Sequence, residues 1–79
     1  MMIAAAGNVE VPAYLVLAQR GFAIADEGGN WIASQGDLTL VGNSPLELLG
    51  LQQIHEERGA KWRATDAEIQ EFLSRYPQA

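Results

Sequence analysis

The sequence predicts a small single α+β domain, in which a three-stranded antiparallel meander packs against two to three helices in the order α-β-β-β-α-α. The second half of the chain carries two helix-capping patterns, and the middle carries short apolar runs separated by glycine-containing turns. With 79 residues, of which 48% are hydrophobic, the chain is long enough for only one small core. The domain is expected to span residues 9–77, and residues 1–8 are expected to be a disordered N-terminus.

Residues 11–20 are expected to form the first helix. Pro12 suits the first helical position, because its missing N–H would have no partner there. Gly21 suits the position after the helix, where a left-handed conformation is needed. A strand over residues 13–18 is the alternative, although the alanines, leucines and glutamine in this segment favour the helix.

Three short strands are expected over residues 22–25, 31–34 and 38–41. The first alternates large and small apolar residues, as a strand with one face on a core would. The segments between them, residues 26–30 and 35–37, contain glycines that supply the positive φ angles of hairpin turns. Such short connections join antiparallel strands, because parallel neighbours need long crossovers.

A capping pattern predicts the second helix over residues 45–58. Ser44 can accept a hydrogen bond from the backbone three residues on, and Glu47 can reach back to the cap. Pro45 fits the first helical position, and Gly59 is expected to end the helix.

A second capping pattern predicts the last helix. Thr65 and Glu68 have the spacing of a capping box, and Pro77 is expected to end the helix. Its apolar residues recur at helical spacing and form one stripe: Ile69, Phe72, Leu73 and Tyr76.

The second helix is expected to be apolar on two sides, so it needs two covering surfaces. One side carries Leu48, Leu51 and Ile54, and the other carries Leu46 and Leu49. The sheet is expected to cover one side. Either the last helix or a partner molecule covers the other, and the last helix is the favoured candidate.

Three residues are informative because of their size. Gly50 lies inside the second helix, which predicts close approach by another backbone or an aromatic ring; a merely tolerated weak position is the alternative. Trp31 and Trp62 are each expected to plug an edge of the core. Trp62, which lies between Lys61 and Arg63, is the better candidate for an interface anchor.

Ten acidic and five basic residues give a net charge of −5. Residues 1–57 hold seven acids and one base, which is −6, and residues 58–79 hold three acids and four bases, which is +1. Nucleic-acid binding and adsorption to an anionic membrane are not expected, because each needs a basic patch. A basic protein partner fits the charge. The chain also lacks the ~20 apolar residues of a membrane-spanning helix, and it is expected to be cytoplasmic.

Catalytic and metal-binding patterns are missing from the sequence. The chain has no cysteine and one histidine, His55, which excludes a thiol nucleophile and a multi-histidine metal site within one chain. The Gly-x-Ser-x-Gly pattern is absent too. We therefore expect no cofactor and no enzymatic activity.

The segment Gly42-Asn43-Ser44-Pro45-Leu46 resembles the prosthetic-group serine region of acyl carrier proteins, a family of small acidic chains. The resemblance covers about five residues and implies a prosthetic group on Ser44 in an all-helical fold. The sequence departs from that family at Pro45, where a small or branched apolar residue is expected. It departs again in the strands predicted over residues 22–41.

The sequence thus predicts a small acidic, non-catalytic protein-binding module, such as an inhibitor, an immunity-type protein or an adaptor. The alternative is a homodimer in which two middle helices cover each other's leucines across a two-fold axis. An acyl-carrier-like protein modified at Ser44 is a further alternative. The expected contact residues are Leu46, Leu49, Glu56, Glu57 and Trp62.

Overall fold

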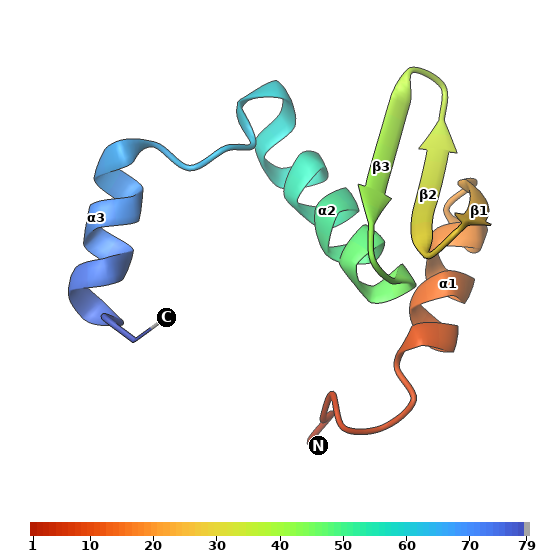
Figure 1. The fold of residues 1–79 in the computed structure, drawn as a ribbon, viewed down its shortest axis with the longest axis horizontal. Helices are drawn as coiled ribbons and strands as arrows, with labels where there is room; N and C mark the ends of the chain where they lie inside the picture. The colour runs from red at the N-terminus through yellow and green to blue at the C-terminus, as the bar shows by residue number, and fades with distance from the viewer. Residues whose placement is uncertain (79) are drawn as a thin grey trace.

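Helix, three strands, helix and helix follow one another in the computed structural model, which describes residues 1–78 (Figure 1). The elements are α1 (Glu10–Gln19), β1 (Ala23–Glu27), β2 (Asn30–Gln35), β3 (Leu38–Gly42), α2 (Pro45–Arg58), a short 3-10 helix η1 (Gly59–Lys61), and α3 (Asp66–Arg75). The predicted fold class and element order are confirmed.

Helix α1 shows that the helical interpretation of residues 11–20 was right and the strand alternative wrong. The helix begins one residue earlier than expected, at Glu10, so Pro12 occupies the third helical position. That position is still in the first turn, where a backbone N–H has no acceptor within the helix. Gly21 follows the helix with a φ of +92°, the left-handed conformation that its position requires.

The sheet is an antiparallel meander with β2 in the centre and β1 and β3 at its edges. Strands β1 and β2 pair as far as Glu27 and Asn30, so only Gly28 and Gly29 form the turn. Both glycines have positive φ, as the tightest right-twisted hairpin turn demands. The turn between β2 and β3 is equally short, and its Gly36 also has positive φ.

The core lies between one face of the sheet and the helices α1 and α2. Leu17 of α1 and Leu48 of α2 are completely buried there. Full burial of a leucine side chain contributes roughly 1.5–3 kcal/mol, so these two residues anchor the helices to the sheet. The buried core cluster consists of Leu17, Phe22, Ala33, Leu40 and Leu48.

Helix α1 also lies beside α2. The carboxylate of Glu10 accepts a hydrogen bond from the backbone N–H of Leu46 at 2.9 Å, and the Arg20 side chain donates to the Gln52 side-chain oxygen. Glu10 therefore places a negative charge at the start of α2, where the helix dipole favours it. The sequence favours the last helix as the cover for the Leu46 side of α2. That expectation is wrong, because α1 is the helix that packs alongside α2.

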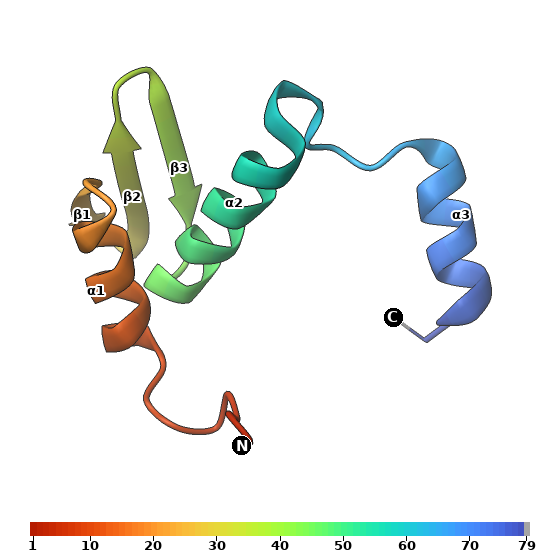
Figure 2. The same ribbon diagram turned by 180° about the vertical axis from the view of Figure 1, so that it is seen from behind.

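Helix α3 stands apart from the rest of the fold in two opposite views (Figures 1 and 2). Within residues 1–78, no helix or strand packs extensively against it. The molecule has a radius of gyration of 14.6 Å, whereas a compact chain of this length has one of ~12 Å. Its accessible surface is 6198 Å², whereas a compact monomer of this mass exposes ~4,700 Å². The excess of ~1,500 Å² comes from the exposed residues 1–8 together with the separation of α3 from the core.

Candidate protein-docking site

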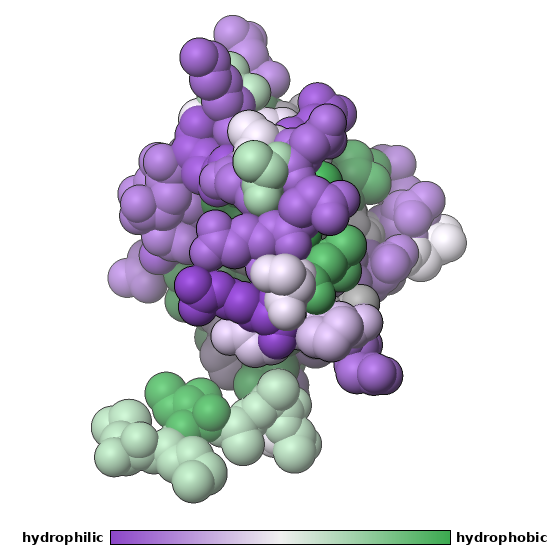
Figure 3. Space-filling view, turned by 90° about the vertical axis from the view of Figure 1, so that its left-hand side faces the viewer, coloured by the Kyte–Doolittle hydropathy of each residue, from purple (hydrophilic) through white to green (hydrophobic). Residues whose placement is uncertain are grey.

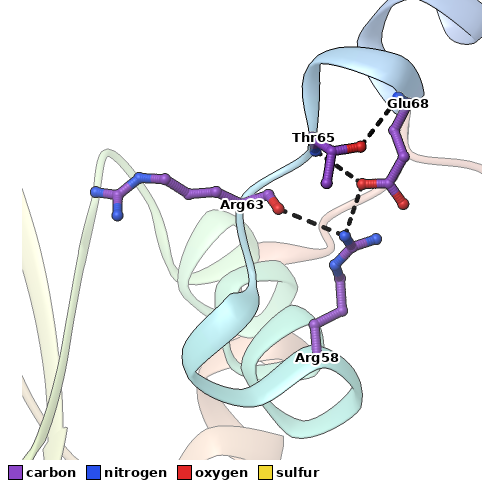
Figure 4. Close-up of polar contacts among 4 residues, drawn as sticks. All are labelled: Arg58, Arg63, Thr65 and Glu68. Atoms are coloured by element: carbon purple, nitrogen blue, oxygen red, sulfur yellow. Dashed lines mark hydrogen bonds and ion pairs between the residues drawn. The ribbon is translucent and has the colours of Figure 1, made fainter.

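The side chain of Arg58, at the end of α2, holds the start of α3 in place (Figure 4). Its Nη2 donates to Oε1 of Glu68 at 2.9 Å and to the backbone oxygen of Arg63 at 3.4 Å. The same Glu68 oxygen accepts from the backbone N–H of Thr65 at 2.8 Å, and the Thr65 hydroxyl accepts from the N–H of Glu68 at 3.2 Å. The predicted capping box is thus confirmed. We call these four residues the clamp.

Charge stabilises the clamp. The hydrogen bond from Arg58 is the main cause that lowers the pKa of the Glu68 carboxyl from 4.5 to about 2, and the bond from the Thr65 backbone adds to it. Glu68 is therefore ionised at neutral pH, and its negative charge also lies in the first turn of α3, where the helix dipole favours it.

Beyond the clamp, α3 presents the predicted apolar stripe to solvent. Its members are 40–57% exposed: Ile69, Phe72, Leu73 and Tyr76. The rings of Phe72 and Tyr76 pack on each other with their centroids 5.3 Å apart. Figure 3 views the molecule from the side of α3, where the surface is mostly hydrophilic and hydrophobic residues show at its margin. The helix is thus amphipathic, and its apolar side has no cover among residues 1–78.

A second apolar surface is a groove of about 320 Å³ between edge strand β3 and the second half of α2. We call it the β3–α2 groove. Leu38 and Leu51 in its lining are half-buried and pack on the core, whereas Ile54 and Trp62 are each about 40% exposed. The lining residues are Leu38, Thr39, Leu40, Val41, Leu51, Ile54, His55 and Trp62.

Trp62 joins the groove to the basic segment that precedes α3. The guanidinium carbon of Arg63 lies 4.6 Å from the centroid of the Trp62 ring, a cation–π contact. Trp62 is 42% exposed, so it does not plug the core as expected. Trp31 is half-buried and packs against the core cluster, as predicted.

The other expected contact residues do not join Trp62 in one site. Leu49 is half-buried against the core, and Leu46 is 41% exposed at the start of α2. Glu56 and Glu57 accept hydrogen bonds from Gln52 and Gln53, one turn earlier in α2. At 100° per residue, Glu56 lies on the side of α2 opposite the groove, and Glu57 lies at the flank, about 60° around the helix from Ile54.

A shallower hollow of about 490 Å³ lies where the starts of α1 and α2 meet. It is lined by Glu10, Val11, Tyr14, Trp31, Ser44 and Pro45. The hydroxyl of Ser44 caps α2. It accepts a hydrogen bond from the backbone N–H of Glu47 at 3.2 Å. The Glu47 side chain reaches Asn43 rather than Ser44, so only the serine half of this predicted capping box forms. The strands also depart from the all-helical fold that an acyl carrier protein would have.

Catalytic groups do not converge at the groove. Its polar lining residues are Thr39 and His55, and no carboxylate among the described residues belongs to it. Among residues 1–78, no group of three His, Cys, Asp or Glu side chains is arranged to hold a metal ion. The β3–α2 groove is therefore suited to apolar contact, and His55 is the only imidazole in its lining.

Sequence reasoning missed the groove. It placed Ile54 on the core side of α2, but the helix continues past the sheet, and Ile54 is left 41% exposed. The lengths of the two elements could have revealed the groove. The 14 residues of α2 span ~21 Å, whereas the five residues of β3 span ~17 Å, so the end of the helix extends past the strand.

Comparison with protein-family models, curated proteins and solved structures finds no match to this chain. None of the helices in residues 1–78 combines the length and the hydropathy that crossing a bilayer requires.

Proposed function

We propose that this protein is a small acidic, non-catalytic binding module that acts in the cytoplasm by docking to protein surfaces, as an inhibitor, an immunity-type protein or an adaptor does. The observation that carries this proposal is the uncovered apolar stripe of α3. An amphipathic helix that lays residues i, i+3, i+4 and i+7 into an apolar groove is a recurrent mode of protein recognition.

The length of α3 supports the proposal. The helix has ten residues, whereas isolated helices shorter than ~12–15 residues are marginal in water. Its caps and its ion pair between Glu71 and Arg75 stabilise it only locally. A surface that covers the stripe supplies the tertiary contacts that such a helix normally needs.

The charge distribution supports a basic partner. Glu56 and Glu57 are exposed on α2 and do not line the groove, and the net charge is −5. A negative face of this kind accelerates the approach of a basic protein, whereas buried apolar anchors give the complex its lifetime.

The proposal is tested by capture from the native cell with the tagged full chain. We compare the unchanged protein with Phe72→Glu, which places a charge in the stripe, and with Gln70→Glu, which adds the same charge to the same helix off the stripe. We expect the unchanged protein and Gln70→Glu to retain protein partners, including further copies of the chain. We expect Phe72→Glu to lose them. Equal capture by all three proteins would refute docking through α3.

A further inference from the structure

We infer that the occupant of the β3–α2 groove is the α3 stripe of a second copy of this chain, so that two copies exchange their C-terminal helices across a two-fold axis. This inference rests on the proposed docking function and names the occupant of its apolar contact, whose groove lining includes neither Glu56 nor Glu57. Exchange of an identical element between protomers is a low-cost route to a dimer, because each contact is made twice.

Both halves of the contact lie on one chain, and both are apolar. The stripe contributes Phe72, Leu73 and their neighbours, and the groove contributes Ile54 and Trp62 among its exposed lining residues. The charges around them are complementary. Residues 66–75 of α3 carry three acids and one base, whereas the segment that follows the groove, residues 58–63, carries three bases and no acid.

The clamp disfavours closure of α3 onto its own groove. Arg58 ties both the backbone of Arg63 and the side chain of Glu68 to the end of α2. In this arrangement α3 leads away from β3, as two opposite views show (Figures 1 and 2). Folding back would break the clamp bonds that cross from α2, whereas docking into another copy keeps them.

The available area decides between one docked helix and a reciprocal pair. With side chains of roughly 200 Å² each, the four stripe residues expose about 400 Å². A single helix in a single groove therefore buries about 800 Å² in total, which is the size of a crystal contact. Two reciprocal contacts bury about 1,600 Å², the standard size of a specific interface.

The first measurement is sedimentation equilibrium on the purified full chain over a wide concentration range, with helix content recorded by circular dichroism. We expect a species of twice the 8.6 kDa chain mass, with helicity that rises as the dimer forms. Phe72→Glu should shift the dissociation constant at least tenfold towards the monomer, and Gln70→Glu should leave it within about twofold.

The second measurement uses the absence of cysteine from the chain. A tagged chain with Ile54→Cys is mixed with an untagged chain with Phe72→Cys under mild oxidation. The tagged–untagged disulfide should form about tenfold faster than with Gln70→Cys in place of Phe72→Cys, because the dimer holds the two thiols at millimolar effective concentration. A chain that carries both Ile54→Cys and Phe72→Cys tests whether α3 closes onto its own groove, because the disulfide would then form within one monomer.

The outcomes separate the two proposals. A monomer at all concentrations overturns the exchange of helices, and so does a disulfide that forms within one chain. The docking function still stands in either case if capture from the cell depends on Phe72. If neither self-association nor capture responds to Phe72→Glu, both proposals fail. A dimer that cross-links equally through Gln70→Cys would place the interface elsewhere and overturn the inference.

Discussion

The Nη2 atom of Arg58 lies 2.9 Å from Oε1 of Glu68, and this ion pair connects the end of α2 to the first turn of α3. Both side chains are more than 40% exposed, yet the pair has support that an isolated surface pair lacks. The same carboxylate oxygen caps the helix through Thr65, and the same guanidinium nitrogen holds the connecting backbone at Arg63. One contact therefore sets both the start and the direction of α3.

Arg58→Ala should loosen α3 without weakening the core, because Arg58 bonds to Arg63 and Glu68 and does not belong to the core cluster. We expect faster amide exchange throughout α3 and an unchanged midpoint for unfolding of the sheet. Arg75→Ala is the matched control, since its partner Glu71 belongs to the same helix. Unchanged exchange in the Arg58→Ala protein would show that the clamp does not hold the helix.

The clamp should also depend on pH in one direction. The pKa of Glu68 is lowered in the folded protein, to about 2 from 4.5. The unfolded chain therefore binds a proton more readily, and stability rises with pH between these values. The contribution is fully present above about pH 4.5 and is lost as the pH falls through about 2. A carboxyl-carbon NMR titration should show this low pKa, and Arg58→Ala should return it towards 4.5.

Leu48 and Leu46 should respond differently to truncation although they are two positions apart. Leu48 is completely buried, so Leu48→Ala should lower the free energy of unfolding by about 2–5 kcal/mol. Leu46 is 41% exposed, and Leu46→Ala should cost less than about 1 kcal/mol in the isolated chain. Urea denaturation measures both values. Similar losses would mean that Leu46 is a core residue.

Two glycines should respond with opposite signs to substitution by alanine. Gly21 has a φ of +92°, and an added methyl group would come within 2.7 Å of the Gln35 amide nitrogen. Gly21→Ala should therefore destabilise the fold by about 1–2 kcal/mol or more. Gly50 has no atom within 4 Å of the same methyl position, so Gly50→Ala should stabilise α2 by about 1 kcal/mol. Thermal unfolding of the two variants tests the pair, and a loss of stability in Gly50→Ala would contradict it.

Local signals predicted the elements well because they act through neighbouring residues. Ser44 and Thr65 cap their helices as expected, and the turns fall on glycines with positive φ. Packing between distant segments was predicted less well. The apolar stripe of α3 predicts a covering surface, but the pattern does not identify that surface. Gly50 likewise predicted a close neighbour, yet the space beside it is open.

The candidate site was predicted in part. Trp62 was singled out for its size and its basic neighbours, and it does line the groove. The helical wheel predicts Leu49 as a contact residue, but Leu49 packs against the core. A wheel shows which residues share a side of a helix, whereas the identity of the element that covers that side depends on the whole topology. Here that element is α1, whose Glu10 bonds to Leu46 from 36 positions earlier in the chain.

The separation of α3 from the core has an evolutionary consequence. A substitution in the stripe perturbs no residue of the hydrophobic core, because none of the buried cluster belongs to α3. Under the docking function that we propose, selection can therefore change the specificity of α3 without destabilising the rest of the fold. New specificity would arise most readily in α3. For the same reason, α3 could be grafted onto another small domain without disturbing that domain's core.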